Sequence, residues 1–155
     1  MHSYALAALF LAATLLTACW MMGDPGYRME PVGMEKINQN QWVKKSDGFD
    51  LQTNAIGGLT GEWWIDPHLA ISTGPKPVTI QSVELQAAKG VYPATIKEES
   101  KVIPALSSLT ILNLSWRFEE DTPAPGILGD SSRIVFHLKV GNKQQTADIE
   151  YKRSK

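Results

Sequence analysis

Few side chains in this chain are of the types that carry out catalysis. The 155 residues include three histidines and one cysteine, and two of the histidines, His68 and His137, lie well inside the chain. Neither has a neighbouring cysteine or belongs to a spaced set of zinc ligands. The sequence has no Gly-x-Ser-x-Gly elbow that would mark a nucleophilic serine. We therefore expect a protein that is not an enzyme and has no cofactor.

One run of three acidic residues is a possible metal site. Glu119-Glu120-Asp121 precedes a proline-rich segment, and three adjacent carboxylates could hold a calcium ion. A solvated acidic loop at the end of a strand explains the same residues, and we favour that explanation. We expect no bound metal.

The adjacent pair Trp63-Trp64 points to binding. Neighbouring residues of a strand face opposite sides of the sheet. If Trp63 shares the inward phase of Ile65, then Trp64 faces outward beside Glu62. An exposed tryptophan offers a flat apolar surface to a partner protein or to a sugar ring. Trp64 and Glu62 are therefore the candidate binding residues, with the alternative that a second sheet or a loop covers Trp64.

The elements that would position these residues show a period of two, which is typical of half-buried strands. In residues 112–118 apolar side chains alternate with polar ones, and Trp116 is the strongest core candidate. Residues 134–140 and 147–151 flank a Gly141-Asn142 turn and predict a hairpin. The apolar phase changes within residues 78–86, which predicts a bulge near Ser82. Further strands are expected at residues 59–65, 69–73, 94–98 and 102–103.

Seven or eight short strands, connections rich in proline and glycine, and no long helix predict an all-β fold. We expect an antiparallel β-sandwich of immunoglobulin-like topology after a cleaved signal peptide. The Cys…Trp…Cys signature of antibody domains is absent from the sequence. The immunoglobulin-like topology is therefore inferred from the strand pattern alone.

The first part of the chain has the composition of an export signal. Residues 5–16 are apolar and carry no charge, and Leu16-Thr17-Ala18-Cys19 follows at the end of that run. The run is shorter than the roughly 20 residues that span a bilayer. Extended to Met22 it approaches that length, so an uncleaved membrane anchor remains the alternative.

Leu16-Thr17-Ala18-Cys19 resembles the lipobox of bacterial lipoproteins. The resemblance implies that the Cys19 thiol receives a diacylglycerol and that cleavage before Cys19 makes it the first mature residue. Trp20 stands where an aspartate commonly retains lipoproteins at the inner membrane. By the same resemblance the protein is lipid-anchored in the cell envelope, in the outer membrane and facing the periplasm. More than one acyl chain gives stable attachment.

These patterns predict three segments. Residues 1–18 are the lipoprotein signal peptide, residues 19–45 are the lipidated N-terminus and a tether, and residues 46–155 are the β-sandwich domain. The tether is inferred because Pro, Gly and Asn interrupt every short periodic pattern before residue 45.

The charge balance restricts the partners. With 15 basic and 16 acidic residues the chain is nearly neutral, which argues against nucleic acid as a partner. We expect a membrane-anchored, non-catalytic structural or protein-interaction module, such as an accessory subunit of an envelope or secretion assembly. The alternative is a module that binds a glycan or another small ligand. A groove that combines an aromatic face with hydrogen-bonding groups would favour a glycan, whereas a flat apolar patch or bare strand edge would favour a protein.

Overall fold

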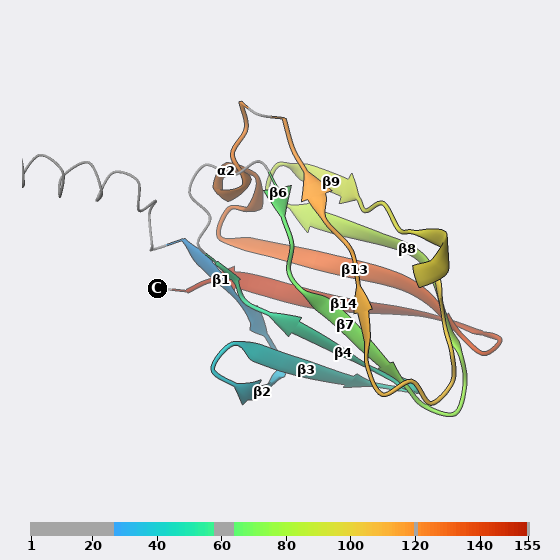
Figure 1. Ribbon diagram of the computed structural model, residues 1–155. Coiled ribbons are helices and arrows are strands. Elements are labelled where there is room, and N and C mark those ends of the chain that lie inside the picture. Colours follow the sequence, from blue (N-terminus) through green and yellow to red (C-terminus); the bar gives the residue numbers. More distant parts are fainter. Residues whose placement is uncertain (1–26, 58–63, 120, 155) are drawn as a thin grey trace, which may run out of the picture.

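Antiparallel sheets pack face to face in the computed structural model, which describes residues 27–57, 64–119 and 121–154 (Figure 1). Helices contribute only a 3₁₀ turn, η1 (Glu98–Ser100), and a short α-helix, α2 (Ala124–Leu128), within these residues. The predicted all-β antiparallel sandwich is confirmed. The immunoglobulin-like topology is not confirmed by the observed strand orders and stays a prediction.

Within the described residues the larger sheet has seven strands in the order β10-β8-β13-β14-β1-β5, with β9 also pairing with β8. Their bounds are β1 Arg28–Val32, β5 Ile56–Gly57, β8 Val78–Ala87, β9 Gly90–Pro93, β10 Val102–Ile103, β13 Ser131–Val140 and β14 Lys143–Arg153. The long hairpin of β13 and β14 lies at its centre.

A five-stranded sheet covers one face of the larger sheet, in the order β11-β7-β4-β3-β2. Its strands are β2 Glu35–Asn38, β3 Gln41–Ser46, β4 Phe49–Asn54, β7 Leu69–Thr73 and β11 Thr110–Leu112. A third sheet consists of two short strands, β6 Trp64–Ile65 and β12 Trp116–Arg117.

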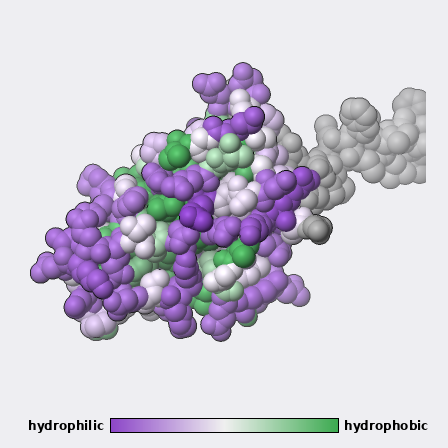
Figure 2. Space-filling view, turned by 180° about the vertical axis from the view of Figure 1, so that it is seen from behind, coloured by the Kyte–Doolittle hydropathy of each residue, from purple (hydrophilic) through white to green (hydrophobic). Residues whose placement is uncertain are grey.

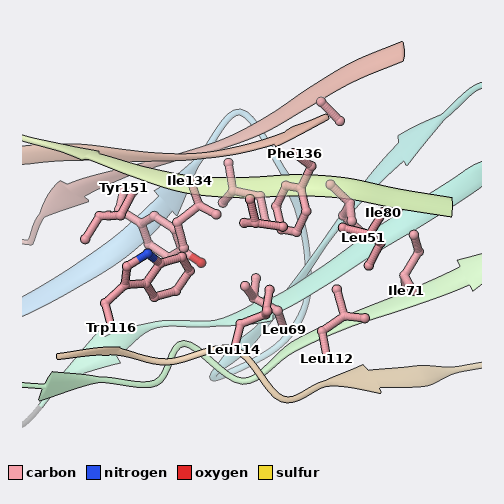
Figure 3. Close-up of a cluster of buried hydrophobic side chains, with 14 of the residues drawn as sticks. Leu51, Leu69, Ile71, Ile80, Leu112, Leu114, Trp116, Ile134, Phe136 and Tyr151 are labelled. Carbon is pink, nitrogen blue, oxygen red and sulfur yellow. The ribbon is translucent and has the colours of Figure 1, made fainter. Parts of the chain in front are cut away.

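The core fills the space between the sheets, as Figure 3 shows. Phe136 comes from the larger sheet and Leu51 from the five-stranded one, and both are completely buried. The prediction that Trp116 is a core residue is confirmed, since its side chain is 2% exposed. Its indole Nε1–H donates a hydrogen bond of 2.9 Å to the Tyr92 carbonyl oxygen, which satisfies the one polar group of the ring.

Local patterns predicted the last hairpin and the bulge correctly. β13 pairs with β14 through a two-residue turn, and Gly141 has a φ of 58° at the first turn position, as in type II′ hairpins. The register of β8 against β13 shifts by one residue, because His137 pairs with Ser82 and Leu138 with Ile80. Gln81 is therefore the extra residue of the predicted bulge.

The tether expected to extend to residue 45 is wrong from residue 28 onward, since β1, β2 and most of β3 lie before residue 46. Pro31 is tolerated in β1 because β5 pairs only with Arg28 and Met29, which leaves the strand edge open beside Pro31. Gly33, with a φ of 70°, lies where the chain passes from the larger sheet to the five-stranded one. Residues that suggested a linker therefore mark strand edges and turns.

Two further strand predictions need correction. Residues 94–97 form no strand and η1 follows them, whereas β9 lies just before this segment. Residues 112–118 alternate in burial as predicted but do not form one strand: Leu112 ends β11, Trp116 and Arg117 form β12 in a different sheet, and residues 113–115 connect the two. Within residues 59–65 the structure describes Trp64 and Ile65, which form β6, and the remainder lies outside the described residues.

Candidate binding cleft

Trp64 occupies the position that its alternation predicts. β6 pairs with β12 so that Ile65 lies opposite Trp116 and Trp64 lies opposite Arg117. Ile65 and Trp116 point into the core, and Trp64 and Arg117 therefore point outward. The Trp64 side chain is 49% exposed, which leaves much of its ring free for contact.

Trp64 lines a cleft of about 530 Å³ at one end of the sandwich. Its walls come from four parts of the described chain: the start of β1, the turn between β2 and β3, the segment 54–57 and the segment 64–68. The lining residues are Arg28, Asn40, Asn54, Ala55, Ile56, Gly57, Trp64, Ile65, Asp66 and His68. An aromatic side chain thus shares the cleft with two amides, a guanidinium, a carboxylate and an imidazole.

Arg28 is held in place by its neighbours. Its Nε–H donates to Glu30 Oε1 at 3.0 Å, and its Nη2–H donates to Asn40 Oδ1 at 3.0 Å. Because a guanidinium carries five N–H donors, these two bonds leave other N–H groups available. The Arg28 side chain is therefore oriented before any ligand arrives, which lowers the entropy cost of a further bond.

Asp66 and His68, which also line the cleft, belong to a tight turn with Pro67. The His68 backbone N–H donates to Asp66 Oδ1 at 3.0 Å, and His68 has a φ of 49°. Aspartate favours this turn because its side chain can bond the backbone two residues further on. The Pro67 carbonyl oxygen accepts a hydrogen bond of 3.0 Å from Thr53 Oγ1. The turn is thereby fixed to β4.

The other candidate groups are not brought together. His137 lies on β13, opposite Ser82 and Thr146, and it is not among the residues that line the cleft with His68. Among the described residues no group of three or more His, Cys, Asp or Glu side chains could hold a metal ion. Glu120 lies outside the described residues, and so the acidic run is described only at Glu119 and Asp121.

Two predicted site residues, Cys19 and Glu62, lie outside the described residues. In the part of the chain that is described, no helix has the length and apolar character needed to cross a bilayer. The sequence prediction missed Arg28, Asn40 and Asn54, because strand pairing between distant segments brings them to Trp64. The Asp66-Pro67-His68 turn was a local signal that could have been used.

No protein-family model matches the chain, and a search of curated proteins finds no match.

Proposed function

We propose that this protein is an envelope lipoprotein, anchored in the outer membrane through lipid on Cys19, whose sandwich is a non-catalytic binding module. The lipobox-like motif at the end of an uncharged apolar run supports the anchor. Since β1 begins at Arg28, only residues 20–27 separate Cys19 from the sandwich. The cleft, which Arg28 lines, is thus joined to the anchor by a short length of chain.

The ligand that fits the cleft best is part of a glycan. The observation that carries this proposal is the half-exposed Trp64 in a cleft with polar side chains on its other walls. A sugar ring presents C–H groups that can stack on an indole face, and its hydroxyls both donate and accept hydrogen bonds. The amides of Asn40 and Asn54 offer both donors and acceptors. The volume falls within the range of small-ligand sites.

The test is a titration of the purified full chain in detergent with soluble peptidoglycan fragments, followed by calorimetry. Trp64→Ala should weaken binding by more than tenfold, because stacked aromatic side chains are typical binding hot spots. Val91→Ala is the control, since Val91 is 60% exposed on β9 and is not part of the cleft. Equal affinity of both variants, or no binding of any fragment by the native chain, would contradict the glycan proposal.

A protein partner is the second candidate, because the half-exposed Trp64 also offers a flat apolar surface to another protein. In that case the sandwich would dock to another envelope component, as an accessory subunit of an envelope or secretion assembly does. Crosslinking in intact cells, followed by affinity purification of the native chain and Trp64→Ala, separates the two candidates. A discrete protein recovered only with the native chain would establish a partner at the Trp64 surface.

The anchor is tested by the intact mass of the protein from membranes. A lipoprotein should begin at Cys19 and carry the added mass of its acyl chains, and Cys19→Ala should remove that mass. A chain that retains residues 1–18 and carries no acyl group would instead establish the uncleaved membrane anchor.

A further inference from the structure

Hydrophilic side chains cover most of the face shown in Figure 2, and the apolar ones lie in small separate groups. The described residues of that face offer no broad apolar surface to a partner protein. The polar groups gathered in the cleft are a stronger guide to a ligand, because a hollow fixes both the shape and the chemistry of what it binds.

Arg28 offers the cleft hydrogen-bond donors and no acceptor. Of the five N–H groups of a guanidinium, Nε–H is used by Glu30 and one Nη2–H by Asn40. The remaining N–H groups, two on Nη1 and one on Nη2, bond to no described residue. A Cβ added at Gly57, which also lines the cleft, would lie 3.9 Å from Nη1. Because Gly57 has no side chain, Nη1 is left uncovered on this side.

Asn40 adds further donors beside Arg28. Its Oδ1 accepts the Arg28 Nη2–H at 3.0 Å. Because a guanidinium has no acceptor, only the oxygen of the amide can face it, and the Nδ2 amino group must point elsewhere. The turn that carries Asn40 is itself held, since the Asn40 backbone N–H donates to Asn38 Oδ1 at 3.0 Å. Arg28 and Asn40, which we call the donor pair, therefore present N–H groups in a fixed arrangement.

The two carboxylates near the donor pair have different positions. Glu30 accepts the Arg28 Nε–H but does not line the cleft, and both side chains of this ion pair are 38% exposed. An ion pair that exposed is weak, so Glu30 orients the guanidinium and leaves its outer N–H groups able to bind an anion. Asp66 does line the cleft, and its Oδ1 accepts the His68 N–H. A carboxylate only accepts hydrogen bonds, so Asp66 suits the hydroxyl groups of a ligand.

We infer that the sugar bound in the cleft carries a carboxylate, which the donor pair binds. This inference rests on the proposed glycan function and names the class of sugar. A carboxylate accepts and does not donate, which matches a pair that presents N–H groups, and its bonds to a guanidinium are charge-assisted and frequently bidentate. A phosphate would bring nearly twice the negative charge close to Glu30 and Asp66. The sugar ring stacks on Trp64 and its hydroxyls donate to Asp66.

Paired ligands that differ in one charged group test the inference. The purified full chain in detergent is titrated by calorimetry with the disaccharide of N-acetylglucosamine and N-acetylmuramic acid, whose lactyl group carries a carboxylate, and with the lactyl amide of the same disaccharide. A second pair, a disaccharide of glucuronic acid and its amide, has the carboxylate on the sugar ring. The native chain should bind the acid of at least one pair roughly tenfold more tightly than the amide. The pair that shows the preference identifies where the ligand carries its carboxylate.

Two variants assign this preference to the donor pair. Arg28→Gln should lower the affinity for the acid to that for the amide, while the amide still binds through Trp64. Glu30→Gln keeps an oxygen that can accept the Arg28 Nε–H and removes the negative charge beside it, so the acid should bind more tightly and the amide as before. Glu84→Gln is the matched control, because Glu84 likewise accepts a side-chain N–H, from Gln86 at 2.7 Å, but does not line the cleft.

Equal affinity of the native chain for acid and amide would overturn the inference and leave the glycan proposal standing. A preference for the acid that survives in Arg28→Gln, or one that rises as much in Glu84→Gln as in Glu30→Gln, would also overturn it. If none of these ligands binds, the inference fails, and the titration with peptidoglycan fragments then decides the glycan proposal separately.

Discussion

Replacing Trp116 tests whether the two-stranded sheet is anchored in the core as its geometry indicates. The indole is 2% exposed and bonds to the Tyr92 carbonyl oxygen. Truncation of a buried tryptophan to alanine costs about 3 to 5 kcal/mol, and the unpaired carbonyl accounts for about 1 kcal/mol within that range. Because domains are stable by about 5 to 15 kcal/mol, Trp116→Ala should remove a large part of the free energy of unfolding.

Urea unfolding followed by far-ultraviolet circular dichroism measures this change without relying on the fluorescence of the five tryptophans. Trp116→Phe separates the two contributions, because phenylalanine keeps most of the apolar volume and lacks the N–H. It should cost clearly less than Trp116→Ala. Trp64→Ala, at a half-exposed position, should cost less than about 1 kcal/mol. Equal destabilisation by Trp64→Ala and Trp116→Ala would refute the assignment of one ring to the core and the other to the surface.

Two further predictions concern glycines and a buried tyrosine. Gly129→Ala should destabilise the fold by at least about 1 kcal/mol, because Gly129 has a φ of 65° and an added Cβ would lie 2.8 Å from Ala88 Cβ. Gly126→Ala should instead stabilise the fold by about 0.5 to 1 kcal/mol in the same urea assay, because Gly126 lies in α2 and an added Cβ would meet no atom within 4 Å. Burial raises the pKa of Tyr151 above 10.0, so the unfolded chain loses this proton first and the free energy of unfolding should fall as the pH rises above about 10. Tyr151→Phe should make that fall shallower in urea unfolding measured across this pH range.

The parts of the fold that the sequence predicts well are those whose partners are close in the chain. β13 and β14 are joined by two residues, so their alternation and the Gly141-Asn142 turn act together over a short segment. The bulge in β8 is likewise visible as a change of phase within one strand. Trp116 is recognisable because it shares an inward phase with Leu112 and Leu114, although Leu112 lies in β11, Trp116 lies in β12 of another sheet and Leu114 lies between the two strands.

Residues 28–45 have the composition of a tether but form strands, because their partners are distant in sequence. β1 pairs with β14, and Met29 lies opposite Arg153, more than a hundred residues away. The chain then crosses to the other sheet at Gly33, so no single alternation extends through β1 and β2. Pro31, Gly33 and Asn40 are typical of linkers in composition. Pairing with β14, which composition does not reveal, turns the first part of this segment into a strand of the larger sheet.

The residues of the cleft are likewise predictable only where they depend on local sequence patterns. Trp64 could be identified as an outward-facing residue from its neighbours alone, because alternation is a local rule. Its surroundings could not: Arg28 reaches the cleft through the pairing of β1 with β5, and Asn40 through the turn between β2 and β3. Whether an exposed tryptophan suits a flat protein surface or a sugar depends on these polar groups. The presence of Arg28, Asn40 and Asn54 beside the ring is therefore what moves the proposal for this cleft from a protein partner toward a glycan.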